Sequence, residues 1–578
     1  MSHIRCRPKR KSARLFRNTS IFHVQHPFLE PTAIWATVTR VEEYRQLTPN
    51  SMSDEHRHNL FQLYMVMSIG AVRSFRRGEA SLHPFGFFTA ALQVMAPRGF
   101  CFNRLEDIQN FLLIGRFGVY FYIGCSIWEI GRICIRICIE LSLHREPAGL
   151  GEDQEQRLIV FWESYSLDRF ASSMLGRPFG IDDNDIEIPT PAMTQTLQYA
   201  HGVFAHMVEL ACISSNMRRA LTGEDGTVPN ADSGIHRSRR VGSIYATLGA
   251  FFQKLTQWRA TAPIREMPTC IFHMPEYFEL RYQEERLALL RAAIETTRPG
   301  TPPDRCPDYD ASAPWAPLHG KLSSGFPSHV IEKSCLEAAV GIICAYDVLQ
   351  RRGVIMYSRY YMQVLFSSGI LIILVVFSRV DKKSRVYTEH TTIPVRLDAV
   401  DYGSGPSSLS HGVVDVSDWL SLSFVDSNRG EEISLDRALE AIHIAGGLLS
   451  WLAQQMPDSA LYSRVFDALK QSLERMARRY NLQQTRATTR DHADVLPVHT
   501  DSLNVADILA QNSHNPDLSN GLDYSPSVDT ETSLTHLLEE LLPNMPANML
   551  GDFNGEPEAW PLSQIPFMPG LMDYDFQF

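Results

Sequence analysis

The sequence lacks the short motifs that mark common enzyme active sites. It contains no P-loop, no nucleophile elbow, no His-Glu-x-x-His zinc motif and no glycine pattern for dinucleotide binding. Because each of these patterns positions a nucleophile, a metal or a phosphate group, their absence removes the usual sequence grounds for a catalytic site. We therefore expect that the chain is not an enzyme.

Cysteine is scarce and unevenly spaced, with 10 residues among 578. The N-terminus is basic and has no apolar run, so it does not resemble a secretory signal. A chain without such a signal is expected to keep its thiols reduced, as in the cytosol or the nucleus.

Positive charge is missing from one end of the chain. Residues 501–578 hold 13 acidic residues and no Lys or Arg, whereas residues 1–500 hold 54 basic and 52 acidic residues. At the other end seven cations lie within thirteen positions, namely Arg5, Arg7, Lys9, Arg10, Lys11, Arg14 and Arg17. A basic head and an acidic tail on a neutral body indicate targeting and partner contacts, not a charged substrate cleft.

Long apolar runs are also missing. The most apolar stretch, "GILIILVVF" at residues 369–377, follows Ser367 and Ser368 and is stopped by "RVDKK". A membrane span needs about 20 nearly uninterrupted apolar residues. We therefore expect a buried central helix here, with a membrane span as the weaker alternative.

Helical periodicity dominates what remains, and it predicts an all-α fold. Apolar residues recur at helical spacing through residues 21–295, which we expect to form a helical domain. Residues 296–328 carry seven prolines and predict a loop. The helical domain is expected to continue over residues 329–482, with an irregular insert at 381–431. Residues 1–20 and 483–578 predict a basic and an acidic disordered tail.

Within the acidic tail, "SLTHLLEELLPNM" has the pattern of a short amphipathic helix. Its leucines fall at positions i, i+3, i+4, i+7 and i+8, and they are Leu534, Leu537, Leu538, Leu541 and Leu542. Glu539 and Glu540 lie off that face, and Pro543 ends the run. Such a helix can fold in the groove of a partner protein, so this segment is the expected activation region.

"GRICIRICIELSLHRE" at residues 131–146 raises the question of a metal site. Cys134, Cys138 and His144 are potential ligands, but two thiols are too few for a structural zinc, which normally takes four ligands. The alternating Ile and Leu residues suit a strand, whereas Arg136 and Glu140 suit an ion pair on a polar helix face. Periodicity leaves strand and helix open. In either case we expect the thiols to pack as small apolar groups.

Two other clusters of polar residues have a structural and a functional interpretation. His56 and His58 have no further ligand nearby, which favours a solvated polar segment. Asp168 and Arg169, within "FWESYSLDRFASSMLGRPFG", could be perturbed active-site groups. A structural ion pair at a helix junction is the favoured interpretation.

The middle of the chain resembles the regulatory region of fungal binuclear zinc-cluster transcription factors. The resemblance covers about residues 20–380 and rests on an ordered set of positions. These include Leu143, His144, Arg145, Phe161, Trp162, Asp168, Arg169, Gly176, Arg177, Pro178, Asp182, Asp183, Asp185 and Pro189. It implies an all-helical domain with a helix over 131–144. It also implies that His144, Arg145, Trp162, Asp168, Arg169, Gly176, Arg177 and Pro178 are structural or regulatory, not catalytic.

The family's DNA-reading module, six cysteines around two zinc ions, has no counterpart here. Before Cys101 the chain has one cysteine, Cys6 in "IRCRPKRKSAR", so we expect no zinc and no other cofactor in this chain. Either the module is lost from the gene product as given, or the protein acts through a partner. DNA contact would then come from a missing module or that partner, with Arg5, Arg7, Lys9, Arg10 and Lys11 as a nuclear address or a phosphate-contacting arm.

The resemblance implies a nuclear regulator of RNA polymerase II genes, in a metabolic or secondary-metabolite pathway. The acidic tail would contact the transcription machinery or co-regulators, and the helical body could respond to a small-molecule inducer. The alternative is a small-molecule-sensing or inhibitory subunit without its own DNA-binding domain.

Overall fold

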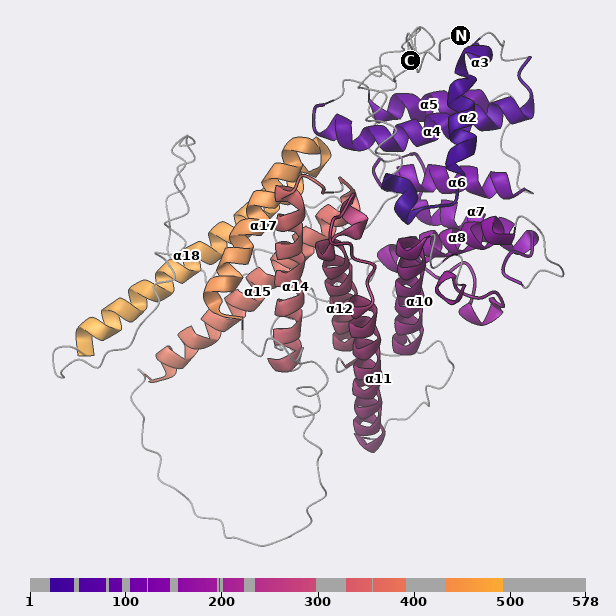
Figure 1. Ribbon diagram of the computed structural model, residues 1–578. Coiled ribbons are helices and arrows are strands. Elements are labelled where there is room, and N and C mark those ends of the chain that lie inside the picture. The colour runs from indigo at the N-terminus through magenta and orange to yellow at the C-terminus, as the bar shows by residue number, and fades with distance from the viewer. Residues whose placement is uncertain are drawn as a thin grey trace.

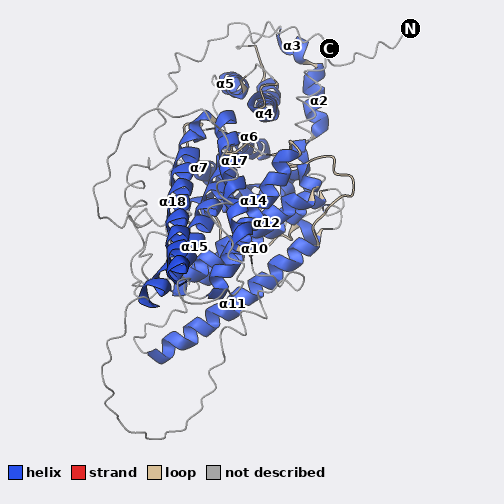
Figure 2. Cartoon of the chain, turned by 90° about the vertical axis from the view of Figure 1, so that its left-hand side faces the viewer, coloured by secondary structure: helices blue, strands red, loops and turns tan. Residues whose placement is uncertain are grey.

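The computed structural model describes residues 21–45, 51–79, 83–95, 104–121, 123–145, 154–194, 197, 201–222, 234–297, 329–355, 357–390 and 433–491. Helices dominate these residues, and Figure 2 draws no strand among them. The predicted all-α fold is therefore confirmed for the described part of the chain. The basic head, most of the Pro-rich segment and the Leu534–Leu542 segment lie outside it.

The helices fall into two groups along the chain (Figure 1). The first group is α2 (Pro31–Thr39), α3 (Val41–Arg45), α4 (Asp54–Arg76), α5 (Pro84–Met95), α6 (Leu105–Gly118), α7 (Ile127–Glu140), α8 (Gln154–Leu175) and α10 (Gly202–Thr222). The second is α11 (Gly234–Ala260), α12 (Pro275–Thr297), α14 (His329–Arg351), α15 (Arg359–His390), α17 (Leu435–Gln455) and α18 (Ala460–Asp491). Short 3₁₀ turns are η1 (Asp183–Asp185), η2 (Pro191–Met193), η3 (Ile271–His273) and η4 (Pro457–Ser459).

Each group has its own hydrophobic core, and α10 belongs to both. Phe204 and Val208 on α10 pack into the core of the first group. Val203 and Leu210 on the same helix pack into the core of α11, α12, α14, α15, α17 and α18. Because a helix buried on two sides cannot leave one core without disturbing the other, α10 joins the two halves.

Local signals explain where several helices begin. The Ser126 hydroxyl accepts from the backbone N–H of Trp128 at 3.3 Å, and Glu129 accepts from the Ser126 N–H at 3.2 Å. This capping box starts α7, and Ser53 and Ser434 cap α4 and α17 in a similar way.

The question of strand or helix around Cys134 is settled in favour of a helix, but it is shorter than expected. α7 ends at Glu140, and Ser142 takes a left-handed conformation with φ 54°. The N–H of Leu143 then donates to Cys138 O at 2.8 Å, which closes a Schellman turn. The expected helix over 131–144 is therefore wrong at its end, and His144 lies in the turn.

Two helices also run further than the sequence indicated. α15 continues to His390, so the first ten residues of the insert predicted at 381–431 are helical. α18 continues to Asp491, past the boundary predicted at 482. Both extensions are mainly polar, so neither gives an apolar period to detect.

The apolar stretch at 369–377 lies inside α15. Among the described residues one helix, over Arg359–Phe377, is long and apolar enough to cross a membrane, and 72% of its window is buried inside the protein. Ile372, Leu365 and Val375 on this helix are buried in the second core. The burial favours the predicted central core helix.

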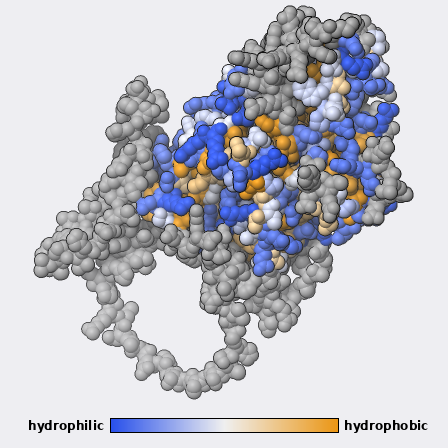
Figure 3. Space-filling model, in the orientation of Figure 1, coloured by the Kyte–Doolittle hydropathy of each residue, from blue (hydrophilic) through white to orange (hydrophobic). Residues whose placement is uncertain are grey.

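The outer surface of the described residues is mainly polar. On the face drawn in Figure 3, hydrophilic residues predominate and hydrophobic residues lie in small groups between them. The large hydrophobic side chains that are most exposed are Trp35, Ile139, Met193, Ile264 and Met267. Single exposed hydrophobic side chains of this kind are normal on a protein surface.

Candidate functional site

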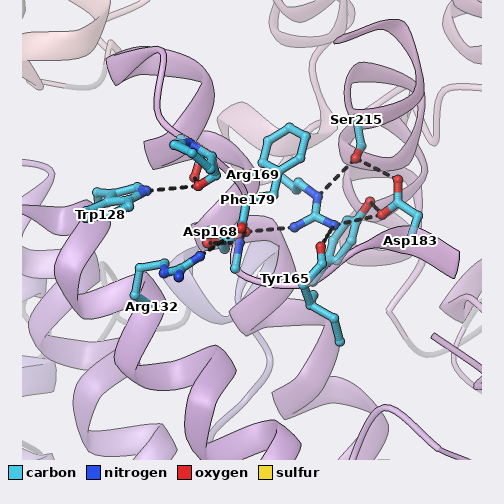
Figure 4. Close-up of polar contacts among 12 residues, drawn as sticks. Trp128, Arg132, Tyr165, Asp168, Arg169, Phe179, Asp183 and Ser215 are labelled. Carbon is cyan, nitrogen blue, oxygen red and sulfur yellow. Dashed lines mark hydrogen bonds and ion pairs between the residues drawn. The ribbon is translucent and has the colours of Figure 1, made fainter. Parts of the chain in front are cut away.

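The motif that carries the family resemblance folds around one buried arginine (Figure 4). Arg169 on α8 is 2% exposed, and its neighbour Asp168 is fully buried. The Arg169 guanidinium donates to Asp168 Oδ2 at 2.7 Å, to the Ile181 carbonyl at 2.8 Å and to Asp183 Oδ1 at 2.8 Å. Its Nε donates to Ser215 Oγ on α10 at 3.1 Å. Nearly all the donors of this buried cation therefore have acceptors.

Aromatic rings cover the guanidinium on both sides. The Arg169 Cζ lies 4.0 Å from the ring centroid of Tyr165 and 4.3 Å from that of Phe179. Tyr165 also donates its hydroxyl to Asp183 Oδ1 at 2.9 Å. This packing excludes water and ties α8 to the segment that follows it.

The pKa values of the carboxyl groups of Asp168 and Asp183 shift in opposite directions. Burial alone would raise the pKa of Asp183, but Arg169 and the hydroxyl groups of Ser215 and Tyr165 outweigh it and hold that pKa below its usual range. For Asp168, burial dominates and raises the pKa in spite of the Gly180 N–H and Arg169. Because both carboxyl groups are already occupied by the protein's own donors, the arrangement is that of a structural ion pair.

Other motif residues fix the 176–190 segment after α8. Gly176 has φ +62°, and the N–H of Arg177 donates back to Ser172 O at 3.0 Å, so this glycine ends α8 in a left-handed turn. Gly180 donates its N–H to both oxygens of Asp168, at 3.1 and 2.9 Å. A Cβ on Gly180 would lie 2.9 Å from Asp168 Oδ1, so only glycine permits this approach.

Two tryptophans hold the same segment from α7 and α8. Trp128 Nε1 donates to Pro178 O at 3.2 Å, and the Arg177 guanidinium lies 4.8 Å from the Trp128 ring centroid. Trp162 Nε1 donates to Pro189 O at 3.0 Å. The motif is thus brought together in space, and its residues fasten one segment onto two helices.

The remaining motif and candidate residues lie at the edge of this structure or away from it. His144 is buried and its carbonyl accepts from the Glu187 N–H at 2.9 Å. Arg145 follows it in the turn after α7. His58 on α4 lies 3.2 Å from the Asn110 side-chain amide, while His56 packs against Tyr44 with 5.1 Å between ring centroids. His58 therefore does not belong to a solvated segment, and these two histidines share no common site.

The thiols of α7 do not fit a metal site. Cys134 and Cys138 are fully buried in the first core. Burial raises the pKa of Cys134 far above its usual range and that of Cys138 to about 12. Metal ligation requires a thiolate, which this apolar surrounding opposes. Among the described residues no group of three or more His, Cys, Asp or Glu side chains is placed to hold a metal ion.

A cavity of about 300 Å³ lies where the two cores meet, and no sequence pattern marks its position. Residues from α6, α8, α10, α12 and α15 line it, together with the short helix at residues 21–25. On one wall Glu163 is 1% exposed and pairs with Arg116 at 2.7 Å and with His26 Nδ1 at 2.8 Å. Burial and Arg116 lower the pKa of His26, so it is the neutral imidazole that donates to Glu163.

The opposite wall carries a second buried ion pair on α12. Arg281 pairs with Glu284 and lies 3.7 Å from Glu285. The hydroxyl of Tyr360, from the start of α15, donates to Glu284 Oε2 at 3.2 Å. Burial raises the pKa of Glu284 to about 7, against the opposing effect of Arg281. The only signal in the sequence is the charge of "RYQEER", which also suits a solvated helix face.

In a comparison with known proteins, most residues of the first core fall within the match to one family model. Residues 14–206 match the family described as "Fungal specific transcription factor domain". The chain is 31% identical to the negative regulator of pleiotropic drug resistance STB5 of Candida glabrata, over 27% of this chain and 16% of that protein. It is 28% identical to Protein STB5 of Saccharomyces cerevisiae, over 29% of this chain and 24% of that protein.

A longer match reaches beyond the family domain. The positive regulator of purine utilization of Emericella nidulans is 22% identical over 52% of this chain and 32% of its own length. The chain thus spans about a third or less of the length of these curated relatives. No solved structure gives a significant match.

Proposed function

We propose that this chain, which carries a fungal specific transcription factor domain over residues 14–206, is a nuclear regulator of RNA polymerase II transcription that acts on metabolic genes. The observation that carries the proposal is the ordered motif from His144 to Pro178, which lies inside the matched residues and folds as one unit around Arg169. The relatives described as regulators support it. The chain acts by binding, not by catalysis.

The acidic tail is the proposed contact with the transcription machinery. Leucines at helical spacing, flanked by Glu539 and Glu540, suit an amphipathic helix that binds in an apolar groove. DNA contact would come from a zinc module or from a partner protein. Arg5, Arg7, Lys9, Arg10 and Lys11 would serve as the nuclear address.

A reporter assay tests this function. The full chain fused to an unrelated DNA-binding domain is expected to activate a reporter, and the triple variant L537A/L538A/L541A is expected to lose most of that activity. Leu503, Leu509 and Leu518 lie in the same tail outside the predicted helix, so L503A/L509A/L518A is the matched control. A silent fusion that is expressed and nuclear would refute the activation model.

A sensing or inhibitory subunit is the second candidate function, and the cavity between the cores favours it. The cavity is lined by buried polar side chains instead of a purely apolar surface. A ligand there would contact helices of both halves, which suits a regulatory input.

A further inference from the structure

Several buried polar atoms on residues that line the cavity have no hydrogen-bond partner among the described residues. They include Glu284 Oε1, Arg281 Nε and, from α8, Ser166 Oγ. Glu284 is 7% exposed, and its other oxygen is already engaged by Arg281 and Tyr360. Since leaving a buried donor or acceptor unpaired is costly, these atoms indicate that something else supplies their partners.

The first two atoms belong to one ion pair and offer complementary chemistry. Glu284 Oε1 is an acceptor and Arg281 Nε is a donor, and the two side chains pair through their other atoms, Oε2 and Nη1. A free acceptor and a free donor on one ion pair match a ligand that carries both an N–H and a C=O. Amides and lactams carry both groups.

Aromatic side chains form much of the surrounding wall. Phe22, Phe170, Tyr277, Tyr360 and Tyr361 line the cavity, and the rings of Phe170 and Tyr360 meet edge to face with centroids 5.0 Å apart. Faces and edges of fixed rings favour a flat molecule that can stack on them.

Most charges of the wall are paired within the protein. Glu163 is paired with Arg116, Arg169 with Asp168 and Asp183, and Arg281 faces both Glu284 and Glu285. Burial raises the pKa of Glu285 as it does that of Glu284, which reduces the negative charge of the α12 wall. An anionic ligand would meet three glutamates here and a cationic one would meet the arginines, so an uncharged ligand fits best.

We propose that the cavity binds a small, uncharged, planar molecule with a lactam or amide edge, whose N–H donates to Glu284 and whose C=O accepts from Arg281. A cavity of about 300 Å³ corresponds to about ten waters at roughly 30 Å³ each, so the ligand has on the order of ten non-hydrogen atoms. The inference deepens the proposed sensing function. Binding itself is measured on the purified chain and does not depend on reporter activity.

Two lactam probes test the site directly. Uracil and hypoxanthine are titrated into the full chain by calorimetry, and melting is followed at saturating probe. At least one of the two is expected to bind and to raise the melting temperature by a few degrees or more. 1,3-Dimethyluracil keeps the ring and both carbonyls but has no N–H, and it is expected not to bind. If neither lactam binds, or if the dimethylated probe binds equally well, the proposal is overturned.

Matched variants locate the binding in the cavity. E284Q keeps the size of the side chain but replaces the charged acceptor, and it is expected to weaken lactam binding at least tenfold. Glu279 lies on the same helix but does not line the cavity, and it pairs with Arg259 at 2.7 Å. The control variant E279Q is therefore expected to bind the lactam like the parent chain.

A second blocking variant does not touch the ion pair. Ala288 lines the cavity on α12 and is exposed, so A288F is expected to fold normally and to abolish binding by filling the space. If both E284Q and A288F bind the lactam with unchanged affinity, the probe binds elsewhere and the proposed site is wrong. If the chain activates the reporter but binds no lactam, the ligand proposal fails and the proposed regulatory function stands. If it binds the lactam but does not activate the reporter, the binding site stands and the proposed activation fails.

Discussion

Arg169 shows how many residues of a sequence motif can contact one side chain. Its guanidinium contacts Asp168, Asp183, the Ile181 carbonyl and Ser215, so it joins α8, the segment after it and α10. No ligand is needed to complete this set of contacts. The contacts of Arg169 therefore serve the fold. Arg169 also lines the cavity, whereas Glu284 and Arg281, which carry unpaired atoms, lie outside the motif.

Replacing Arg169 with Ala is expected to destabilise the protein strongly. The change leaves the fully buried carboxyl of Asp168 without its cation, and breaking a buried pair from one side typically costs about 3–5 kcal/mol. The Arg136–Glu140 pair is the control, because both side chains are more than half exposed at 57% and 54%. R136A should change the free energy of unfolding by about 0.5 kcal/mol or less in urea denaturation. Equal effects of the two changes would contradict the structural role of Arg169.

Stability is also expected to depend on pH through half-buried histidines. Burial, with a smaller effect of His201, lowers the pKa of His23 from 6.5 to about 4, and burial lowers the pKa of His201 too. In this pH range the unfolded chain binds protons that the folded chain does not. The stabilisation is therefore complete above about pH 6.5 and is lost as the pH falls toward 4.

The variant H23Q/H201Q tests this pH dependence. Without the two imidazoles, the loss of stability between pH 6.5 and pH 4 should become shallower, as measured by melting temperature across the range. His26 is buried and has a lowered pKa as well, so part of the slope should remain. If the slope of the variant matches that of the parent protein, the lowered pKa values of His23 and His201 do not cause the pH dependence.

The types of residue in the sequence predict which side chains pack in the core better than they predict which side chains line the cavity. The burial of Cys134 and Cys138 and the structural role of Asp168 and Arg169 follow from general preferences of these side chains. Glu284 could not be found in this way, because charged residues on a helix usually face water. Only tertiary contacts with Tyr360 from α15 bury it.

At the scale of elements, close helix contacts depend on particular glycines. Gly369 on α15 faces Phe466 on α18, and a Cβ on Gly369 would lie 2.5 Å from the Phe466 ring. Gly447 on α17 has no atom within 4 Å of the corresponding position. The first glycine permits two helices to pack, and the second has no such constraint.

Substituting these two glycines by Ala should have opposite effects. G369A forces the buried ring of Phe466 to move, and overpacking of this kind costs about 1–3 kcal/mol. G447A removes a flexible residue from an exposed position inside a helix and should stabilise by about 0.5–1 kcal/mol. Chemical denaturation of the two variants measures both values. Destabilisation by G447A to the same extent as by G369A would contradict the packing of α15 on α18.

Helix positions were largely predictable from apolar period, but helix ends were not. The apolar period within residues 329–482 predicts further helices, and α14 and α17 lie there. The end of α7 was missed because Ser142 takes a conformation that usually requires glycine or asparagine. Its Schellman turn depends on backbone hydrogen bonds that side-chain patterns do not report.

At the scale of the whole molecule, the residues that match the family model and the cavity overlap only in part. The match ends at residue 206, inside α10, which is the helix that the two cores share. One cavity wall, with Arg116 and Glu163, belongs to the matched residues, while Arg281 and Glu284 follow them. A ligand at this junction would therefore connect residues inside the match with residues outside it.

Arginines at the end of α4 provide a second connection between the halves. Arg73 donates to Gly353 O at 2.5 Å, in the turn before α15, and Arg76 donates to Gln455 O at 3.1 Å, at the end of α17. Both acceptors lie at or beyond the C-terminal end of a helix, where carbonyl groups lack partners within the helix. Hydrogen bonds from a charged donor to such groups contribute about 1.5–3 kcal/mol each.

The double variant R73M/R76M should therefore reduce the cooperativity of unfolding. With these contacts removed, the two cores remain joined mainly through α10 and the cavity walls, so a calorimetric melting curve should broaden or separate into two transitions. R136M/R351M is the control, because Arg136 and Arg351 each pair within their own helix, with Glu140 and Asp347. A lactam that binds the cavity should bring the two transitions of R73M/R76M together again, because it contacts both halves. A single sharp transition in R73M/R76M, identical to that of the control, would mean that α10 alone is sufficient to couple the two cores.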